Sequence, residues 1–143
     1  MNDLCADIGY RSINHAGEQL CGDHVDVVEQ GENSMVIVLA DGLGSGVKAN
    51  ILSTLTGKIL STLSASGVSM EESVNTIAQA LPVCSVRKLA YATFTLLQVT
   101  PTAMAYLAQY DNPNAILLRQ GKSVAYPISK RIIGDKEILE SRF

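Results

Sequence analysis

The feature that most constrains the fold is an apolar segment that runs without interruption into an acidic, glycine-rich turn. Residues 35–40 read Met-Val-Ile-Val-Leu-Ala, and Asp41-Gly42-Leu43-Gly44-Ser45-Gly46 follows directly. A continuous apolar segment of this length is typical of a strand that is buried on both faces. Glycine beside the carboxylate lets a ligand approach the backbone without meeting a Cβ. We therefore predict a central strand that presents Asp41 at its carboxyl end.

Two amphipathic helices are expected after this turn. Apolar residues recur every four positions from Ile51 to Leu63, which is the spacing of the apolar face of a helix. Ser66-Gly67 ends this helix, and Ser69 with Glu72 matches a capping box at the start of the next one. Pro82 should end the second helix, because proline cannot donate the next backbone hydrogen bond. We expect the two helices to pack as an antiparallel pair.

The remaining segments that are rich in β-forming residues predict short strands on both sides of the helices. These segments are residues 4–13, 25–29, 90–100, 104–107, 115–119 and 123–126. Strands, two helices and then more strands, without strict βαβ alternation, predict an α+β fold with mixed β-sheets under a helical layer. The length of 143 residues suits one domain, which we assign to residues 1–143.

Composition and charge exclude several classes of function. The chain is 47% hydrophobic and has a net charge of −3, so it is globular and unsuited to general attraction to nucleic acid or anionic lipid. Cys5, Cys21 and Cys84 are odd in number and form no Cys-x-x-Cys pair, which favours a reducing compartment. No apolar stretch approaches the length of a membrane span, and no signal peptide is visible. A cytoplasmic location is expected.

A second acidic residue, Asp23, begins the strand expected before the central one. In an antiparallel hairpin the start of one strand lies opposite the end of its partner, so Asp23 and Asp41 should meet. Their carboxylates would suit a hard cation such as Mg²⁺ or Mn²⁺. The alternative is that Asp41 only caps the following helix. Alternation along the strand places His24 and Asp26 on the other face, where they are expected to be solvated, and His15 in the preceding loop is interpreted in the same way.

Gly22-Asp23, an apolar strand, Asp41-Gly42-x-Gly-x-Gly and a long helix together resemble the PPM-type metal-dependent protein serine/threonine phosphatases. The resemblance is greatest to their bacterial stage II sporulation protein E (SpoIIE-like) branch. It implies an αββα sandwich, of which this chain would form part. It also implies that two Mg²⁺ or Mn²⁺ ions hold a water whose hydroxide attacks a phosphoserine or phosphothreonine directly.

The resemblance also implies roles for particular residues. Asp41 would bridge both ions, Asp23 and the backbone carbonyl of Gly42 would complete the coordination of one ion, and the two carboxylates would form the catalytic centre. Arg11 could approach the phosphate of the substrate because its planar guanidinium suits phosphate, and Lys48 is a weaker candidate. The implied partner is a phosphorylated bacterial regulatory protein, for which an antagonist of an anti-sigma factor is plausible.

The sequence departs from this family at the second metal ion. The family supplies further carboxylates from a later Asp-Gly strand end and from an Asp near the carboxyl terminus. None of the acidic residues after Tyr110 lies at the end of an apolar strand that is followed by glycine and a helix. These residues are Asp111, Asp135, Glu137 and Glu140. We therefore expect a domain truncated at its carboxyl-terminal part, and the activity of these residues alone is open.

Two other functions compete with the phosphatase. A glycine-rich turn before a helix can bind a nucleotide, although Gly42, Gly44 and Gly46 do not have the spacing of the dinucleotide fingerprint. Gly121-Lys122-Ser123 resembles the end of a phosphate-binding loop, but Ile116 stands where that loop requires glycine. The second alternative is a catalytically silent, phosphatase-like module that serves protein interaction.

Overall fold

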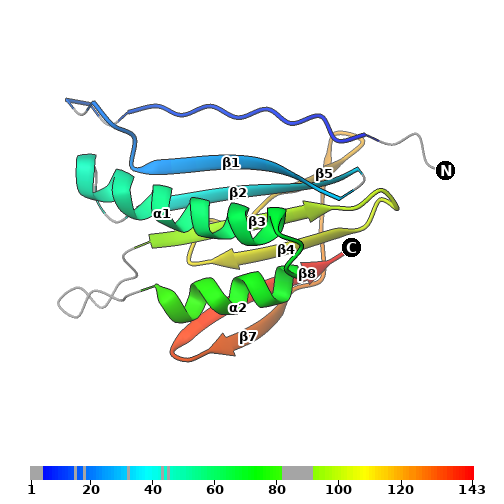
Figure 1. Cartoon of the computed structure of the whole chain (residues 1–143). Coiled ribbons are helices and arrows are strands. Elements are labelled where there is room, and N and C mark those ends of the chain that lie inside the picture. The colour runs from blue at the N-terminus through cyan, green and yellow to red at the C-terminus, as the bar shows by residue number, and fades with distance from the viewer. Residues whose placement is uncertain are drawn as a thin grey trace.

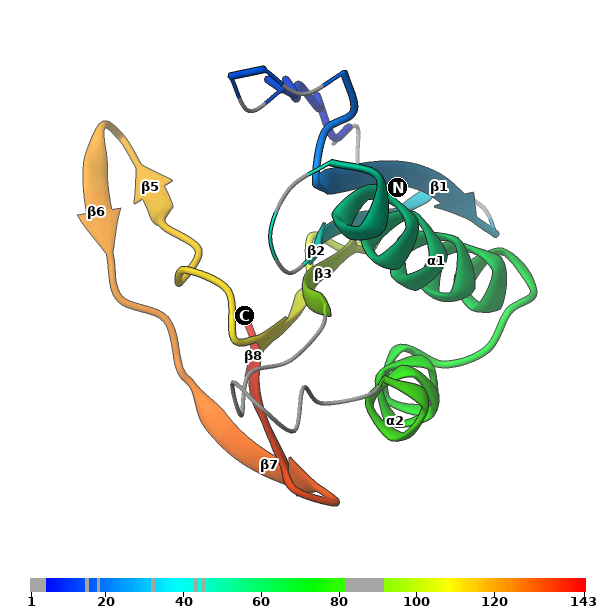
Figure 2. The same cartoon turned by 90° about the vertical axis from the view of Figure 1, so that its left-hand side faces the viewer.

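The structure is a computed structural model that describes residues 5–14, 16–17, 19–31, 33–42, 44, 46–81 and 92–143. A six-stranded antiparallel sheet carries two helices on one face, and a two-stranded hairpin projects away from it (Figures 1 and 2). The elements in chain order are β1 (Asp23–Gln30), β2 (Ser34–Gly42), α1 (Gly46–Ala65), α2 (Met70–Ala80), β3 (Ala92–Val99), β4 (Ala105–Tyr110), β5 (Leu117–Arg119), β6 (Lys122–Val124), β7 (Ser129–Ile133) and β8 (Lys136–Arg142). The predicted α+β class is confirmed.

The apolar segment forms β2, which lies between β1 and β3 in the sheet order β1-β2-β3-β4-β8-β7. Its side chains alternate between the two faces of the sheet, as they must in a strand. Val36, Val38 and Ala40 are fully buried toward the helices, whereas Leu39 on the opposite face is 40% exposed. The central position of this strand is confirmed. The predicted burial of this strand on both faces is not found, because both helices cover the same face of β2.

The first predicted helix is present as α1, but its orientation differs from the prediction. Ile51 and Leu55 are 58% and 57% exposed, while the buried face of α1 carries small residues such as Ala49 and Ser53. The reason is the closeness of the helix to the sheet. A Cβ on Gly42 would lie 2.0 Å from the carbonyl oxygen of Ala49, so bulky side chains cannot fit between the first turns of α1 and the end of β2; farther along the helix, Leu60 is fully buried.

The second helix, α2, begins and ends as the sequence predicts. Ser69 is its N-cap, and the backbone N–H of Glu72 donates to the Ser69 hydroxyl at 3.2 Å. The helix ends at Ala80, one residue before its C-cap Leu81; Pro82 itself lies outside the described residues. Figure 1 shows that α2 runs back antiparallel to α1 over the same face of the sheet. The antiparallel helix pair is therefore confirmed.

The strand expected over residues 4–13 is wrong where the structure describes it. Residues 5–14 adopt no regular secondary structure and are almost all exposed. The strand at residues 25–29 does form, as part of β1, and it pairs with β2, as the predicted meeting of Asp23 and Asp41 requires. It lies at the edge of the sheet. β-forming residues give a strand only where a partner strand and a packed face are available.

The later strands follow the prediction with one omission. β3 and β4 form the expected antiparallel hairpin, and β5 pairs with β6 across the turn at Gln120-Gly121, where both residues have positive φ. The hairpin of β7 and β8 was not predicted. Its signal is present in the sequence, because Gly134-Asp135 separates two β-forming segments and is a two-residue hairpin turn.

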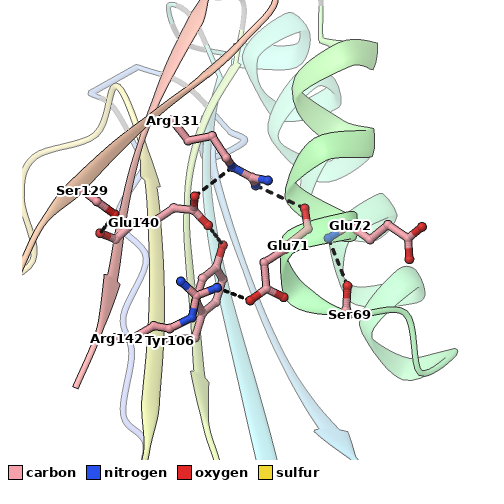
Figure 3. A network of polar contacts seen from close by, with 8 residues as sticks. All are labelled: Ser69, Glu71, Glu72, Tyr106, Ser129, Arg131, Glu140 and Arg142. Carbon is pink, nitrogen blue, oxygen red and sulfur yellow. Dashed lines mark hydrogen bonds and ion pairs between the residues drawn. The ribbon is translucent and has the colours of Figure 1, made fainter.

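A buried polar network joins α2 to the sheet (Figure 3). Glu140 of β8 is only 7% exposed, accepts a hydrogen bond from the Tyr106 hydroxyl at 2.5 Å and pairs with Arg131 at 2.8 Å. Arg131 also donates to the backbone carbonyl of Glu71 in α2 at 3.2 Å, and the Glu71 carboxylate pairs with Arg142. Burial and the neighbouring Glu140 carboxylate raise the pKa of Tyr106. The network therefore fixes the start of α2 against β4, β7 and β8.

Candidate metal site

Asp23 and Asp41 lie directly opposite each other in the β1–β2 hairpin. Their Cα atoms are register partners, so the two side chains share the face of the sheet that the helices do not cover. Both residues line a pocket of about 260 Å³ together with Leu39, Thr95, Asn112 and Pro113. The structure thus brings together the two carboxylates singled out from the sequence.

The electrostatics of this pair favour a bound cation. Partial burial raises the pKa of Asp41 to about 6, and the hydrogen bond and charge of Asp23 act in the same direction. Two carboxylates this close repel each other when both are ionised, and they either share a proton or bind a positive ion between them. Oxygen donors of this kind are the ligands that Mg²⁺ and Mn²⁺ prefer. The donor set therefore fits a hard divalent cation.

The backbone around the carboxylates is shaped by glycine. The N–H of Gly42 donates to the carbonyl of Gly22 at 2.9 Å, which joins the two strand ends. A Cβ on Gly22 would lie 3.3 Å from the Cβ of Ala49 in α1 and 3.4 Å from the carbonyl oxygen of Gly44. Gly22 therefore lets α1 approach this strand end closely. Gly42 itself is required by the approach of α1, which is a different reason from the ligand access that the sequence suggested.

His24 and Asp26 are not solvated, contrary to the prediction. Both are half-buried on the face of β1 that packs against α1, where Nε2 of His24 lies 3.1 Å from the Asp26 carboxylate. Asp26 also accepts a hydrogen bond from Ser61 at 3.1 Å and pairs with Lys58 at 3.4 Å. His24, Ser61 and Lys58 lower the pKa of Asp26 and outweigh the opposing effect of its burial. The cluster holds β1 against the helix.

The basic candidates are not drawn into the pocket. Arg11 is exposed in the segment before β1, and Lys48 is exposed on α1. Neither residue is among those that line the pocket in the part of the chain that the structure describes. His15 lies outside that part. A role for Arg11 in binding phosphate stays a prediction.

Thr95 and Asn112 belong to the pocket and were missed by the sequence interpretation. Asn112 follows β4, and its amide nitrogen donates to the Thr95 hydroxyl of β3 at 3.0 Å. The only signal in the sequence was the turn-forming character of residues 111–114. No local feature of this turn indicates that it lies in space beside the end of the β1–β2 hairpin, which is some seventy residues earlier in the chain.

The described residues supply two acidic ligands and no larger group. No set of three or more His, Cys, Asp or Glu side chains that could hold a metal occurs within them. The acidic residues of β8 point elsewhere, because Glu140 belongs to the buried network with Tyr106 and Arg131. Further ligands could be neutral side-chain oxygens of the pocket, backbone oxygens, water or another segment.

Two sequence-based alternatives can be judged from the topology. Every strand pair in the described sheet is antiparallel, whereas the dinucleotide fingerprint belongs to a parallel βαβ unit. Gly121 and Lys122 lie in the tight β5–β6 hairpin and precede no helix. The topology therefore agrees with the sequence, which argued against both phosphate-binding motifs.

Other features of the chain are consistent with the composition. Cys5 and Cys21 are free thiols, and Cys84 lies outside the described residues. Within the described chain, no helix is both long and apolar enough to cross a bilayer.

Comparison with known structures identifies the fold. The PP2C phosphatase domain of SpoIIE from Bacillus subtilis, solved with a fragment of its regulatory domain, superposes with a TM-score of 0.74 at 21% identity, over 91% of this chain and 40% of that one. RsbX in complex with magnesium superposes with a TM-score of 0.57 at 22% identity, over 71% of this chain and 48% of that one. The structure of the RsbU and RsbW domains of a Mycobacterium tuberculosis protein superposes with a TM-score of 0.54 at 19% identity, over 71% of this chain and 28% of that one.

These likenesses show the fold of PP2C-type, or PPM-type, phosphatase domains, and the chain spans less than half the length of each of these three structures. Comparison with curated protein sequences gives no match. The sequence model of one family, described as stage II sporulation protein E (SpoIIE), matches residues 31–135, which is most of the chain. The protein is a member of the stage II sporulation protein E family of PPM-type phosphatases.

Proposed function

We propose that this chain belongs to an enzyme that hydrolyses phosphoserine or phosphothreonine in a bacterial regulatory protein with the help of Mg²⁺ or Mn²⁺. The observation that carries the proposal is the pairing of Asp23 with Asp41 across two neighbouring strands in a pocket on the open face of the sheet. Family membership supports the reaction class, and the RsbX structure that contains magnesium supports the choice of ion.

In this proposal, Asp41 and Asp23 hold the cation, and the carbonyl of Gly42 adds a backbone oxygen. When bound, such cations lower the pKa of water and offset the charge of the phosphoryl oxygens. Asp41 can take this role only when it is ionised, which its pKa of about 6 allows at neutral pH. Each carboxylate sits at the end of a strand of the sheet, so its position is set by a rigid element.

The substrate and location follow from the same proposal. Relatives of this fold include RsbX and a protein that combines RsbU and RsbW domains, which supports a phosphorylated protein partner such as an antagonist of an anti-sigma factor. The cysteine usage and the lack of a membrane-spanning helix in the described part fit an enzyme of the cytoplasm.

Isothermal titration with Mn²⁺ tests the metal site. The parent chain should bind the ion, and Asp41→Ala should weaken binding at least about tenfold, because one of two charged ligands is removed. Asp135→Asn is the matched control, since this exposed acidic residue lies at the far edge of the sheet. Binding that is unchanged in Asp41→Ala would show that the ion binds elsewhere.

Phosphate release from phosphoserine and phosphothreonine peptides tests the reaction itself. Release that requires Mn²⁺ and disappears in Asp41→Ala is the expected result. A chain that binds Mn²⁺ but releases no phosphate would instead favour the catalytically silent module, for which the small number of acidic ligands among the described residues is the supporting observation.

A further inference from the structure

Besides the two carboxylates, the pocket is lined by two neutral polar side chains, those of Thr95 and Asn112, and by Leu39 and Pro113. Thr93 is the register partner of Asp41 on the neighbouring strand, and Thr95 is the partner of Leu39. Because alternate residues of a strand share a face, both threonines lie on the same open face as Asp41. Asn112 lies over them, and both Thr95 and Asn112 line the pocket.

Hydrogen bonds fix the orientation of the Asn112 amide. The Thr93 hydroxyl donates to its carbonyl oxygen Oδ1, and its nitrogen Nδ2 donates to the Thr95 hydroxyl oxygen at 3.0 Å. The loop that carries Asn112 is itself held, because the N–H of Ala115 donates to Oε1 of Gln109 at 2.6 Å. The amide is thus oriented by two side chains from β3 on a tethered loop.

This arrangement leaves hydrogen-bond donors available to a ligand. The Thr93 hydroxyl takes one lone pair of the Asn112 oxygen, while the Asn112 nitrogen has a second N–H and the Thr95 hydroxyl keeps its own O–H. N–H and O–H donors bind the oxygens of an anion. No Lys, Arg or His is among the described residues that line the pocket. The pocket therefore combines a cation-binding side with a donor side.

We propose that Thr95 and Asn112 bind an oxygen of the substrate phosphoryl group beside the cation held by Asp23 and Asp41. Thr93 acts as a positioning residue, because it orients the amide of Asn112. This inference rests on the proposed function, which supplies the phosphoryl group. It explains how a pocket lined by two carboxylates can accept an anion: the cation offsets the carboxylate charge, and the neutral donors hold the phosphoryl oxygen without repelling it.

Titration of inorganic phosphate into the Mg²⁺-loaded chain tests the inference. Thr95→Val, which keeps the shape of the side chain and removes the donor, should lower phosphate affinity about tenfold, as expected for a hydrogen bond to a charged acceptor. Asn112→Ala should have a similar effect. Thr95→Ser keeps the hydroxyl and should retain the affinity of the parent, and Asn114→Ala, an exposed residue of the same loop, is the matched control.

Parallel Mn²⁺ titrations and melting curves separate the possible results. Unchanged Mn²⁺ affinity with weakened phosphate binding in Thr95→Val and Asn112→Ala is the result expected. Equal phosphate affinity in the parent and both variants, or no phosphate binding by the parent, would overturn the inference while leaving the metal site intact. Weakened Mn²⁺ binding in Asn112→Ala would overturn it in favour of a metal ligand. Failure of the parent to bind Mn²⁺ would remove the proposed function and this inference with it.

Discussion

The protonation of Asp41 depends on its burial and on its neighbour Asp23. Partial burial and the adjacent Asp23 raise its pKa from 3.8 to about 6. Between these two pH values the folded protein holds a proton that the unfolded chain has already released. The contribution of Asp41 to the free energy of unfolding therefore falls as the pH rises from about 4 to about 6, and it is constant above that range.

Metal binding should depend on pH in the opposite direction. Because the ion competes with the proton on Asp41, the apparent affinity for Mn²⁺ should rise up to about tenfold per pH unit below pH 6 and level off above pH 7. Isothermal titrations at half-unit steps from pH 5 to pH 8 measure this profile. An affinity that does not change between pH 5 and pH 7 would contradict the assignment of Asp41 as the proton-sharing ligand.

The stability of the metal-free protein provides the control. Urea unfolding at pH 4 and at pH 6 gives the difference in the free energy of unfolding between the two pH values. This difference includes the decrease that the titration of Asp41 causes. Asp41→Asn removes the titrating group and should remove that part of the difference.

At the scale of elements, the closeness of α1 to the sheet decides which residues each can carry. The helix turns Ala49, Ser53 and Gly57 inward, and its larger residues Ile51 and Leu55 face solvent. Helical periodicity correctly identified the helix, but it assigned the bulky stripe to the core. The sequence also contains a signal for the observed orientation, because small residues at positions 49, 53 and 57 recur every four residues on the opposite face of the helix.

Gly42→Ala tests this close approach. The new Cβ would lie 2.0 Å from the backbone carbonyl oxygen of Ala49, and a backbone atom cannot move aside as a flexible side chain can. The substitution should lower the free energy of unfolding by about 3 kcal/mol. Urea unfolding measures the change. Gly9→Ala is the control because a Cβ there meets nothing within 4 Å, and an equally small effect of both substitutions would contradict the packing.

The second element-scale prediction concerns the attachment of α2 through the buried network of Figure 3. Glu140→Ala would leave Arg131 as a partly buried charge without its carboxylate and the Tyr106 hydroxyl without its acceptor. The free energy of unfolding should fall by about 3 kcal/mol. Denaturant unfolding and hydrogen exchange of the α2 amides measure the effect, and faster exchange in α2 than in α1 is expected.

Glu137→Ala on the same strand is the control. Glu137 pairs with Lys130 at 3.2 Å, but both side chains are more than half exposed, so the change should stay within about 0.5 kcal/mol. Similar losses for the two substitutions would mean that the network does not hold α2 in place.

At the scale of the whole molecule, the pocket lies toward one edge of the sheet and the buried network toward the other. β1, β2 and β3 are consecutive neighbours and carry Asp23, Asp41 and Thr95, while β8 and β7 form the opposite edge with Glu140 and Arg131. The two halves of the sheet therefore have different structural roles. One edge presents polar groups on its open face, and the other attaches α2 on the covered face.

The sequence predicted one part of the candidate site and missed another. The meeting of Asp23 and Asp41 was predictable, because a short hairpin fixes its register through local pairing. Asn112 was not predictable, since its place in the pocket depends on a turn after β4 and on side chains of β3. His24 and Asp26 were wrongly assigned to solvent because alternation gives two faces but does not say which face a helix will cover.

The β7–β8 turn has a practical consequence. Gly134 and Asp135 form an exposed tip at the border farthest from the carboxylate pair in the sheet order. A fluorescent dye or an immobilisation tag attached there would be separated from the ion and phosphate sites by several strands. This tip is accordingly the attachment point best suited to watching occupancy of the pocket in real time without disturbing it.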